Sequence, residues 1–459
     1  MSDVITEAAK YHLSHRGAEN FTAGNHWAPI ERALANVWEK ESNPDGIINL
    51  GLAENSLMHS ETASFLEKNF QVLPSKHLTY GTGPLGSIRL RTTLSSLFTT
   101  HFHSLKPISP SQILPYSSIS ALTDALTWSI CNEGEGILIP RPLYTGFRVD
   151  IPQRSRGIIV PVSFSGLETD GGDAARNHDL DDVFDAELSE QAFERAWKKC
   201  EEDGVKIRAV LLTNPHNPLG KCYPASTLTA VAKFCGRHGL HLICDEIYAL
   251  SVFENRENPS AEKFTSILAV DLEGLIGEDM VHVMYGPSKD LGANGLRLGA
   301  LCSRNEGLIG AAASLAVFSW SPYVLQDIWA ALLEDTEYLN WFASTNQSRL
   351  SENHSLATSF LSSHNIKYFA GSNAGVFIWI DLREYFNIER IEGSVEDKRA
   401  MEKNFVKRCE DKGLFVGYGS NFFSEEVGWF RITFTVGKEI LIEGLERLAG
   451  VLEEGSWKK

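Results

Sequence analysis

The stretch at residues 281–299 constrains the fold most strongly, because it joins a strand-like run to a single lysine and then to an arginine. Residues 281–285 read Val-His-Val-Met-Tyr, which is typical of a buried strand. A Gly-Pro pair breaks this strand, Lys289 follows, and Arg297 stands eight residues later beyond a glycine-rich turn. Alone, such a segment is most often a solvated turn, so its interpretation depends on the motifs upstream.

A second strand-like run ends in an aspartate. Residues 242–244 are apolar, and Asp245 follows them 44 positions before Lys289, with another predicted strand in between. A lysine amine can hold an aldehyde cofactor as a Schiff base. Pyridoxal phosphate stores the electrons of a carbanion in its ring when a carboxylate keeps the ring nitrogen protonated. Asp245 and Lys289 are therefore the pair of residues that this chemistry requires.

A third motif follows the predicted strand at residues 209–212. Residues 213–220 contain two Asn-Pro steps and a glycine, which fix a tight turn because proline restricts its own backbone and that of the preceding residue. In this turn Asn217 can aim its amide at an oxygen anion. Three such motifs, each at the end of a strand, together indicate a site for a pyridoxal cofactor.

Strands and helices alternate through the middle of the chain. Helical patterns at residues 193–202 and 228–237 alternate with the strands predicted at 209–213 and 241–244. This alternation predicts an α/β fold with a mostly parallel sheet covered on both faces, in which active sites gather at the carboxyl ends of the strands. Residues 163–191 are polar and acidic, and we expect them to have little regular structure.

These motifs resemble those of the class I and II aminotransferase superfamily of fold-type I pyridoxal-phosphate enzymes, and most closely those of its 1-aminocyclopropane-1-carboxylate (ACC) synthase branch. The resemblance implies a large α/β domain that binds the cofactor through a mostly parallel sheet, together with a smaller α+β domain. It covers nearly the whole chain. The residues that carry it are 49–55, 140–147, 214–220, 245–248, 288–292 and 429–432.

The length of the chain also predicts more than one domain, because 459 residues exceed one simple hydrophobic core. Guided by the resemblance, we place an N-terminal arm and part of the small domain at residues 1–77. The large cofactor-binding domain then covers residues 78–330. The C-terminal small domain covers residues 331–459.

The resemblance assigns the residues that surround the cofactor ring. It implies that Lys289 forms the Schiff base and later moves the proton of the substrate's Cα atom. Asp245 is expected to hold the ring nitrogen, while Asn217 and Tyr248 bind the phenolic oxygen. Tyr144 lies in a turn after a predicted strand, where a flat aromatic side chain can stack on the pyridine ring.

The cofactor phosphate is expected at the start of the helix predicted after residues 113–116. A helix start offers unpaired N–H groups and the positive end of the helix dipole. Ser118 and Ser120 add hydroxyl groups there, and the alternative for this pattern is an ordinary serine N-cap. By resemblance, Ser288 and Arg297 also belong to the phosphate site.

The sequence departs from the family pattern at Gly286. The family usually has a phosphate-binding serine three residues before the lysine, and a glycine where Ser118 stands. The phosphate site therefore keeps the charge of Arg297 but loses one hydroxyl group. We hypothesise that the hydroxyl of Ser118 replaces it.

Three further residues take their roles from the resemblance. Tyr80 is expected to reach the cofactor phosphate of another subunit, which predicts a homodimer with shared active sites; the alternative is an aromatic residue packed on its own chain. Arg431 lies in a predicted strand among aromatic residues and offers two parallel donors to the carboxylate of an amino acid. Glu54 is expected near the substrate, and its alternative is a polar turn residue.

The composition argues against several partners. A formal net charge of −17 and a pI near 5.3 disfavour nucleic acid and anionic membranes, because both would repel an acidic surface. The N-terminus lacks a signal pattern, and no apolar run reaches the roughly 18 residues of a membrane-spanning helix. The seven cysteines form no C-x-x-C pair, so we expect reduced core residues of a cytoplasmic protein without a metal site.

The predicted activity is that of a pyridoxal-phosphate enzyme acting on an α-amino acid. An aminotransferase-family enzyme ranks first and a carbon–sulfur lyase acting on cysteine conjugates second. ACC synthase ranks third, because the phosphate loop and the surroundings of Tyr80 differ from those of plant-type ACC synthases. The resemblance extends to ACC synthase-like proteins of fungal secondary metabolism. A non-catalytic binding protein on the same fold is the alternative of another class, and Lys289 and Asp245 argue against it.

Overall fold

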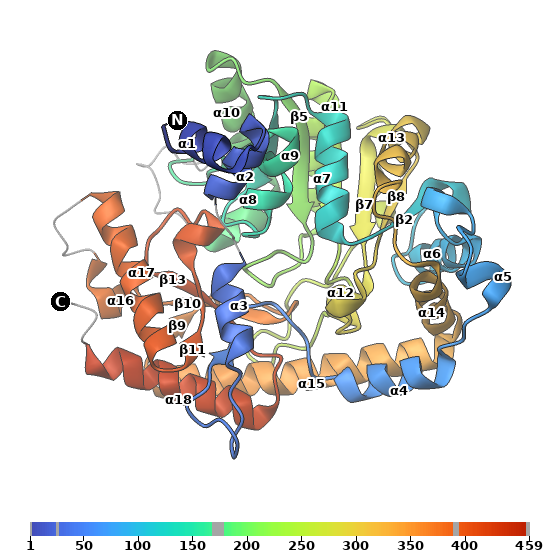
Figure 1. Cartoon of the computed structure of the whole chain (residues 1–459). Helices are drawn as coiled ribbons and strands as arrows, with labels where there is room; N and C mark the ends of the chain where they lie inside the picture. Colours follow the sequence, from blue (N-terminus) through green and yellow to red (C-terminus); the bar gives the residue numbers. More distant parts are fainter. Residues whose placement is uncertain (1, 24–26, 168–178, 389–393, 456–459) are drawn as a thin grey trace.

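A seven-stranded sheet forms the centre of the molecule in the computed structural model, which describes residues 2–23, 27–167, 179–388 and 394–455 (Figure 1). Its strands are β2 (Ile113–Tyr116), β3 (Gly136–Pro140), β4 (Ile158–Val162), β5 (Ile207–Thr213), β6 (His241–Asp245), β7 (Val281–Tyr285) and β8 (Gly299–Ser303). They are arranged in the order β2-β8-β7-β6-β5-β3-β4. The run from β7 to β4 is parallel, while β8 is antiparallel to both β7 and β2. The prediction of a mostly parallel sheet is confirmed.

Helices cover both faces of this sheet. The covering helices are α6 (Ile88–Thr100), α7 (Ile119–Ile130), α10 (Ala186–Glu202), α11 (Ala225–His238), α13 (Glu306–Ala316) and α14 (Tyr323–Glu334). Successive side chains of a strand point to opposite faces. In β5, Val210 and Leu212 belong to a core shared with α6, α10, α11 and α14, whereas Ala209 and Leu211 belong to a core shared with α7 and α13.

The expectation that residues 163–191 lack regular structure is wrong for their second half. A short 3₁₀ turn spans Leu180–Phe184, and α10 already begins at Ala186. The Asp185 side chain caps this helix by accepting hydrogen bonds from the backbone N–H groups of Glu187 and Leu188, each at 2.9 Å. The polar composition of this segment suggested a loop, although its polar residues include the N-cap of a helix. Residues 168–178 lie outside the described residues.

A smaller antiparallel sheet lies beside the large one. It consists of β12 (Gly417–Tyr418), β13 (Trp429–Thr433), β10 (Phe377–Asp381) and β9 (Lys367–Tyr368), in that order. Around it lie α15 (Thr336–Ser363), α17 (Val395–Asp411) and α18 (Lys438–Glu454). Its apolar core contains Phe430 and Leu441 together with Ile48, so the N-terminal segment is part of this half of the molecule.

The N-terminal segment joins the smaller half through β1 (Ile48–Asn49), which pairs in parallel with β11 (Leu414–Phe415). The remaining helices are α1 (Ser2–Tyr11), α2 (His15–Ala23), α3 (Ala28–Ala35), α4 (His59–Asn69), α5 (Pro74–His77), α8 (Phe147–Asp150), α9 (Pro152–Ser155), α12 (Pro287–Asp290) and α16 (Arg383–Phe386). In Figure 1, α15 runs beneath both sheets, from the neighbourhood of α4 to that of α18. The domain limits after residues 77 and 330 remain a proposal.

The seven cysteines are all buried with free thiols, as expected for reduced core residues. Two of them, Cys244 and Cys302, lie in the strands β6 and β8. Within the part of the chain that the structure describes, no helix combines the length and the apolar character needed to span a bilayer.

Candidate active site

The carboxyl ends of three neighbouring parallel strands bring the three sequence motifs to one edge of the large sheet. Thr213 of β5 pairs with Asp245 of β6, which in turn pairs with Met284 of β7, so the strand ends are level. The backbone N–H of Asn214 donates to the carbonyl oxygen of Asp245 at 2.8 Å. The loops that follow these strands carry Asn217 and Lys289.

Lys289 lies on the short helix α12, with its side chain turned toward the N-terminal segment. Its Nζ donates a hydrogen bond to the carbonyl oxygen of Ala53 at 2.5 Å. Burial lowers the pKa of the Lys289 amine to about 8, helped by the charge of Arg431, while the carboxylates of Glu54 and Asp245 act in the opposite direction. Part of the lysine population is therefore unprotonated near neutral pH, which is the form that reacts with a carbonyl group.

Asp245 is buried and poorly paired. Its Oδ1 accepts one hydrogen bond, from the backbone N–H of Ile247 at 3.3 Å. Burial raises the pKa of this carboxyl to about 7, and the nearby Lys289 amine opposes the shift. A buried carboxyl with a single long hydrogen bond lacks a strong donor. The protonated ring nitrogen of pyridoxal phosphate fits this position.

Arg431 joins the two halves of the molecule at the site. Its guanidinium lies over the rings of Phe377 and Phe422, with Cζ 5.1 Å and 4.7 Å from their centroids. One Nη atom donates to Oδ1 of Asn217 at 3.0 Å and the other to the carbonyl oxygen of Gly51 at 2.7 Å. Its buried Nε has no hydrogen-bond partner among the described residues.

Two tyrosines enclose the same space. Tyr248 is buried, and its ring makes an edge-on contact with Phe377 at 5.5 Å. The half-buried ring of Tyr144 covers Gly146, where an added Cβ would lie within 2.6 Å of the ring. Burial raises the pKa of both hydroxyl groups above the usual range, so both remain protonated donors. This arrangement fits a ring that stacks on Tyr144 and accepts a hydrogen bond from Tyr248.

Two of the predicted phosphate residues, Ser118 and Ser120, lie at the start of α7. Ser118 is buried and caps this helix, its Oγ accepting a hydrogen bond from the N–H of Ala121 at 3.0 Å. Ser118 is therefore an N-cap, as the alternative interpretation expected, because its oxygen accepts the capping hydrogen bond. Its O–H group can still donate a hydrogen bond. Ser120 hydrogen-bonds to the carboxyl of Asp150, whose pKa is raised to about 7 mainly by burial. Ser288 is buried in α12.

Arg297 and Tyr80 are the exposed members of the predicted set. An Nη of Arg297 donates to the carbonyl oxygen of Asn294 at 2.8 Å. The side chain of Tyr80 is 82% exposed, and its ring contacts that of Trp320 with centroids 6.1 Å apart. Its predicted role at a second subunit stays a prediction.

Sequence reasoning did not assign roles to three polar residues that contact this site. Asn294 donates to Glu54 at 2.6 Å, and Asp150 bonds to Ser120. The buried carboxylate of Asp290 accepts hydrogen bonds from the N–H of Leu250 at 2.9 Å and from the hydroxyl of Ser251 at 2.6 Å. Only Asp290 gave a signal in the sequence, as the residue that follows Lys289.

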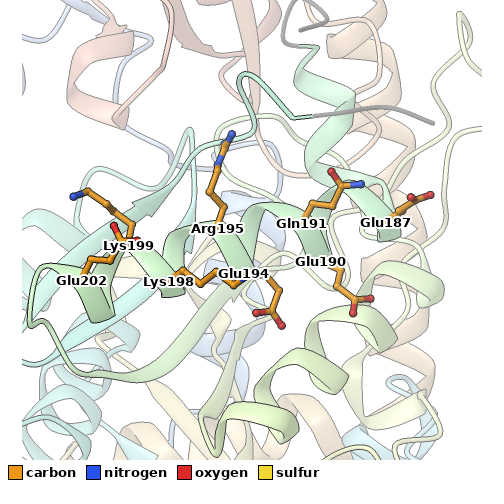
Figure 2. A pocket seen from close by; sticks show the side chains of 8 residues that line it. All are labelled: Glu187, Glu190, Gln191, Glu194, Arg195, Lys198, Lys199 and Glu202. Atoms are coloured by element: carbon orange, nitrogen blue, oxygen red, sulfur yellow. The ribbon is translucent and has the colours of Figure 1, made fainter. Parts of the chain in front are cut away.

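A surface depression elsewhere on the molecule lies along the outer side of α10 (Figure 2). Its lining residues are mostly charged and come from that one helix, and several already have partners. Arg195 donates to the carbonyl oxygen of Ser163 at 2.6 Å, and Glu190 and Glu194 accept from Arg237. We therefore assign no site to this depression.

Comparison with known proteins identifies similar chains. The family model described as "Aminotransferase class I and II" matches residues 45–448. ACC synthase 2 of Cucurbita pepo is 30% identical over 408 residues, which cover 87% of this chain and 76% of that protein. ACC synthase-like protein 1 of Mus musculus is 30% identical and covers 91% and 78%. A probable inactive ACC synthase-like protein 2 from the same species is 29% identical and covers 96% and 72%.

Solved structures share the fold. A double mutant of Thermus thermophilus aspartate aminotransferase superimposes with a TM-score of 0.68 at 18% identity, covering 96% of this chain and 99% of that one. The aromatic aminotransferase of Pyrococcus horikoshii gives 0.67 at 19% identity, covering 94% and 100%. At this level of identity the likeness supports the architecture alone.

Proposed function

Because the chain belongs to the class I and II aminotransferase family, whose members depend on pyridoxal 5′-phosphate, we propose that it transfers the amino group of an α-amino acid. The cofactor, when bound, supplies an electron sink for the negative charge that develops at the substrate's Cα atom. The observation that carries the proposal is the convergence of Lys289, Asp245 and Arg431 on one space at the edge of the large sheet.

Each of these residues has a separate task in the proposal. The Lys289 amine takes the proton from Cα, which its lowered pKa favours near neutral pH. Asp245 holds a protonated ring nitrogen, for which its weakly paired carboxyl is suited. The guanidinium of Arg431 binds the substrate carboxylate and orients the Cα–H bond toward Lys289. Asn217, fixed by Arg431, and Tyr248 donate to the phenolic oxygen.

The phosphate would be held at the start of α7. Ser288 and Arg297 are proposed donors, together with Ser120, whose hydroxyl would turn from Asp150 to the phosphate. Tyr80 of the partner subunit completes them in a homodimer. The hydroxyl of Ser118 retains a free O–H next to the helix N–H groups, which supports its predicted role in place of the missing serine.

An absorbance spectrum of the protein with added pyridoxal phosphate tests the proposal. We expect a band from the lysine-bound cofactor that disappears in Lys289→Ala, whereas Lys233→Ala, on the far helix α11, keeps it. A screen of amino acids and cysteine conjugates then identifies the reaction. Keto acid together with the amino form of the cofactor supports transamination. A protein without any Lys289-dependent band would refute the proposal and favour a non-catalytic binding protein.

A lyase reaction is the second candidate. The relatives named ACC synthases and the position of Glu54 next to Lys289 favour it. Release of ACC in the same screen would identify the cyclising reaction, and pyruvate, ammonia and thiol together would identify cleavage of a carbon–sulfur bond. The role in fungal secondary metabolism and the cytoplasmic location remain predictions from the sequence.

A further inference from the structure

The segment at residues 51–56 crosses the site between the two halves of the molecule. On one side it is bound to the end of β13, where Thr433 N–H donates to the carbonyl oxygen of Leu50 at 2.7 Å and Thr433 Oγ1 to that of Leu52 at 3.1 Å. Further along, the N–H of Ser56 donates to the carbonyl oxygen of Thr435 at 3.0 Å. The segment is therefore anchored to the smaller sheet.

On its other side the same segment touches the loop that follows Lys289. The Lys289 amine donates to Ala53, and the amide of Asn55 lies 3.4 Å from the carbonyl oxygen of Lys289. Gly292 has a φ of +59°, and an added Cβ there would lie 2.4 Å from the carbonyl oxygen of Asn55. Only glycine permits this close approach of the two backbones.

Asn294 connects this loop to Glu54. Its Nδ2 donates to Oε1 of Glu54 at 2.6 Å, across a sequence separation of 240 residues. Its carbonyl oxygen accepts from Arg297 at 2.8 Å, so the same residue also holds a predicted phosphate ligand. The amide of Asn294 carries no charge. It can therefore fix the carboxylate of Glu54 without neutralising it, which a lysine or arginine at this position would do.

We propose that Asn294 is a positioning residue that fixes the Glu54 carboxylate beside the Lys289 amine, so that an anion faces the lysine and the amino group of the substrate. The inference rests on the proposed function of Lys289. In this proposal the Glu54 side chain has a defined orientation, whereas a polar turn residue would be free in solvent. The opposing effect of Glu54 on the lowered pKa of Lys289 supports the same proximity.

The test is a pH titration of the lysine-bound cofactor band in four proteins: wild type, Asn294→Leu, Glu54→Gln and the double variant. Freed from Asn294, the carboxylate moves away and gives less stabilisation to the protonated nitrogen that links Lys289 to the cofactor. The midpoint in Asn294→Leu should fall by about one pH unit. In the Glu54→Gln background the same substitution should change nothing. Circular dichroism verifies the fold of each variant.

Two outcomes would overturn the proposal: an unchanged midpoint in Asn294→Leu, or an equal shift with and without Glu54, which would indicate a general structural effect. The labelling rate of Lys289 by an amine-reactive reagent, followed by mass spectrometry against pH in protein without cofactor, provides the same comparison independently. If no lysine-dependent band exists, the proposed function fails, while the labelling experiment still decides the role of Asn294.

Discussion

Gly286 occupies a position where the backbone of a neighbouring strand leaves no room for a side chain. An added Cβ would lie 2.8 Å from the carbonyl oxygen of Leu298 and 3.2 Å from Cα of Gly299. Both are backbone atoms, one directly before β8 and the other in its first residue, and they cannot rotate away. The serine that the family usually places here is therefore incompatible with this local geometry, and the phosphate site must find its donors elsewhere.

Restoring that serine should harm the protein. We expect Gly286→Ser to lower the free energy of unfolding by about 1–3 kcal/mol through overpacking, and to weaken cofactor binding despite the added hydroxyl. Gly295→Ser is the matched control, because Gly295 is exposed and an added Cβ there meets no atom within 4 Å. Urea unfolding and a titration with pyridoxal phosphate measure both effects. Tighter cofactor binding in Gly286→Ser would contradict the explanation.

At single residues, the sequence predicted the groups that stand at the ends of strands or within a few residues after them. Lys289, Asp245 and Asn217 could be placed because parallel strands end at a common edge. Asn294 and Asp290 could not be assigned, because their importance depends on contacts with residues that are distant in the sequence. The hydrogen bond between Asn294 and Glu54 has no signature in either segment alone.

Among the elements of the fold, the loops after β6 and β7 are held together by the carboxylate of Asp290. Leu250 and Ser251 belong to the first loop, and Asp290 follows Lys289 in the second. Burial raises the pKa of Asp290 to about 7, and the hydrogen bonds from the first loop oppose this shift. The relative position of Asp245 and Lys289 therefore depends on this contact.

Removing the carboxylate should loosen both loops. Asp290→Ala leaves the buried N–H of Leu250 without its acceptor, and we expect a loss of about 2–4 kcal/mol in unfolding free energy. Asp290→Asn keeps one acceptor oxygen and should lose less. Urea unfolding measures the difference, and the cofactor band reports whether the lysine is still in place. Equal stability of Asp290→Ala and the wild type would show that the contact is dispensable.

The elements themselves were predictable to different degrees. Strands such as β6 and β7 follow from short apolar runs that end in turn residues, and both have the predicted position. The start of α10 was missed because its first turns are acidic and polar. Their helical conformation depends on the cap formed by Asp185 and on apolar residues that contact the core, such as Ala192.

For the molecule as a whole, the buried carboxyl groups behind the site make stability depend on pH. Glu246 is fully buried and accepts hydrogen bonds from Ser266 Oγ at 2.6 Å and from Ile267 N–H at 2.9 Å. Burial raises its pKa to about 8. The folded protein therefore binds the proton of Glu246 more tightly than the unfolded chain does. The contribution of this proton to the free energy of unfolding is fully present at acidic pH and is lost as the pH rises toward 8.

The variant Glu246→Gln removes this titration. We expect the unfolding free energy of the wild type to fall between pH 5 and 8, with a contribution from Glu246 of up to about 1.4 kcal/mol per pH unit, and the slope to be smaller in the variant. Glu41→Gln, at an exposed position, should keep the wild-type slope. Parallel slopes in the wild type and Glu246→Gln would show that Glu246 does not titrate in this range.

Exposed apolar residues in the two segments joined by the contact between Tyr80 and Trp320 support the predicted homodimer. Leu78, Tyr80 and Phe318 are 72%, 82% and 83% exposed. In a dimer with shared sites, a heterodimer of Lys289→Ala and Tyr80→Ala chains contains one intact site and one doubly altered site. An equal mixture after subunit exchange should therefore regain about a quarter of the wild-type activity. No recovery, with each parent inactive and exchange confirmed by native mass spectrometry, would place Tyr80 in its own chain.

The long helix α15 links the two halves mechanically. Its 28 residues extend about 42 Å without interruption, and Asp335 is the single residue between it and α14, capping it through the N–H of Tyr338 at 3.0 Å. An unbroken helix resists bending, and this one contributes Phe342 to the core of the larger half and Leu361 to the core of the smaller half. Local unfolding of either half therefore removes packing from the other, so we expect the two halves to unfold together.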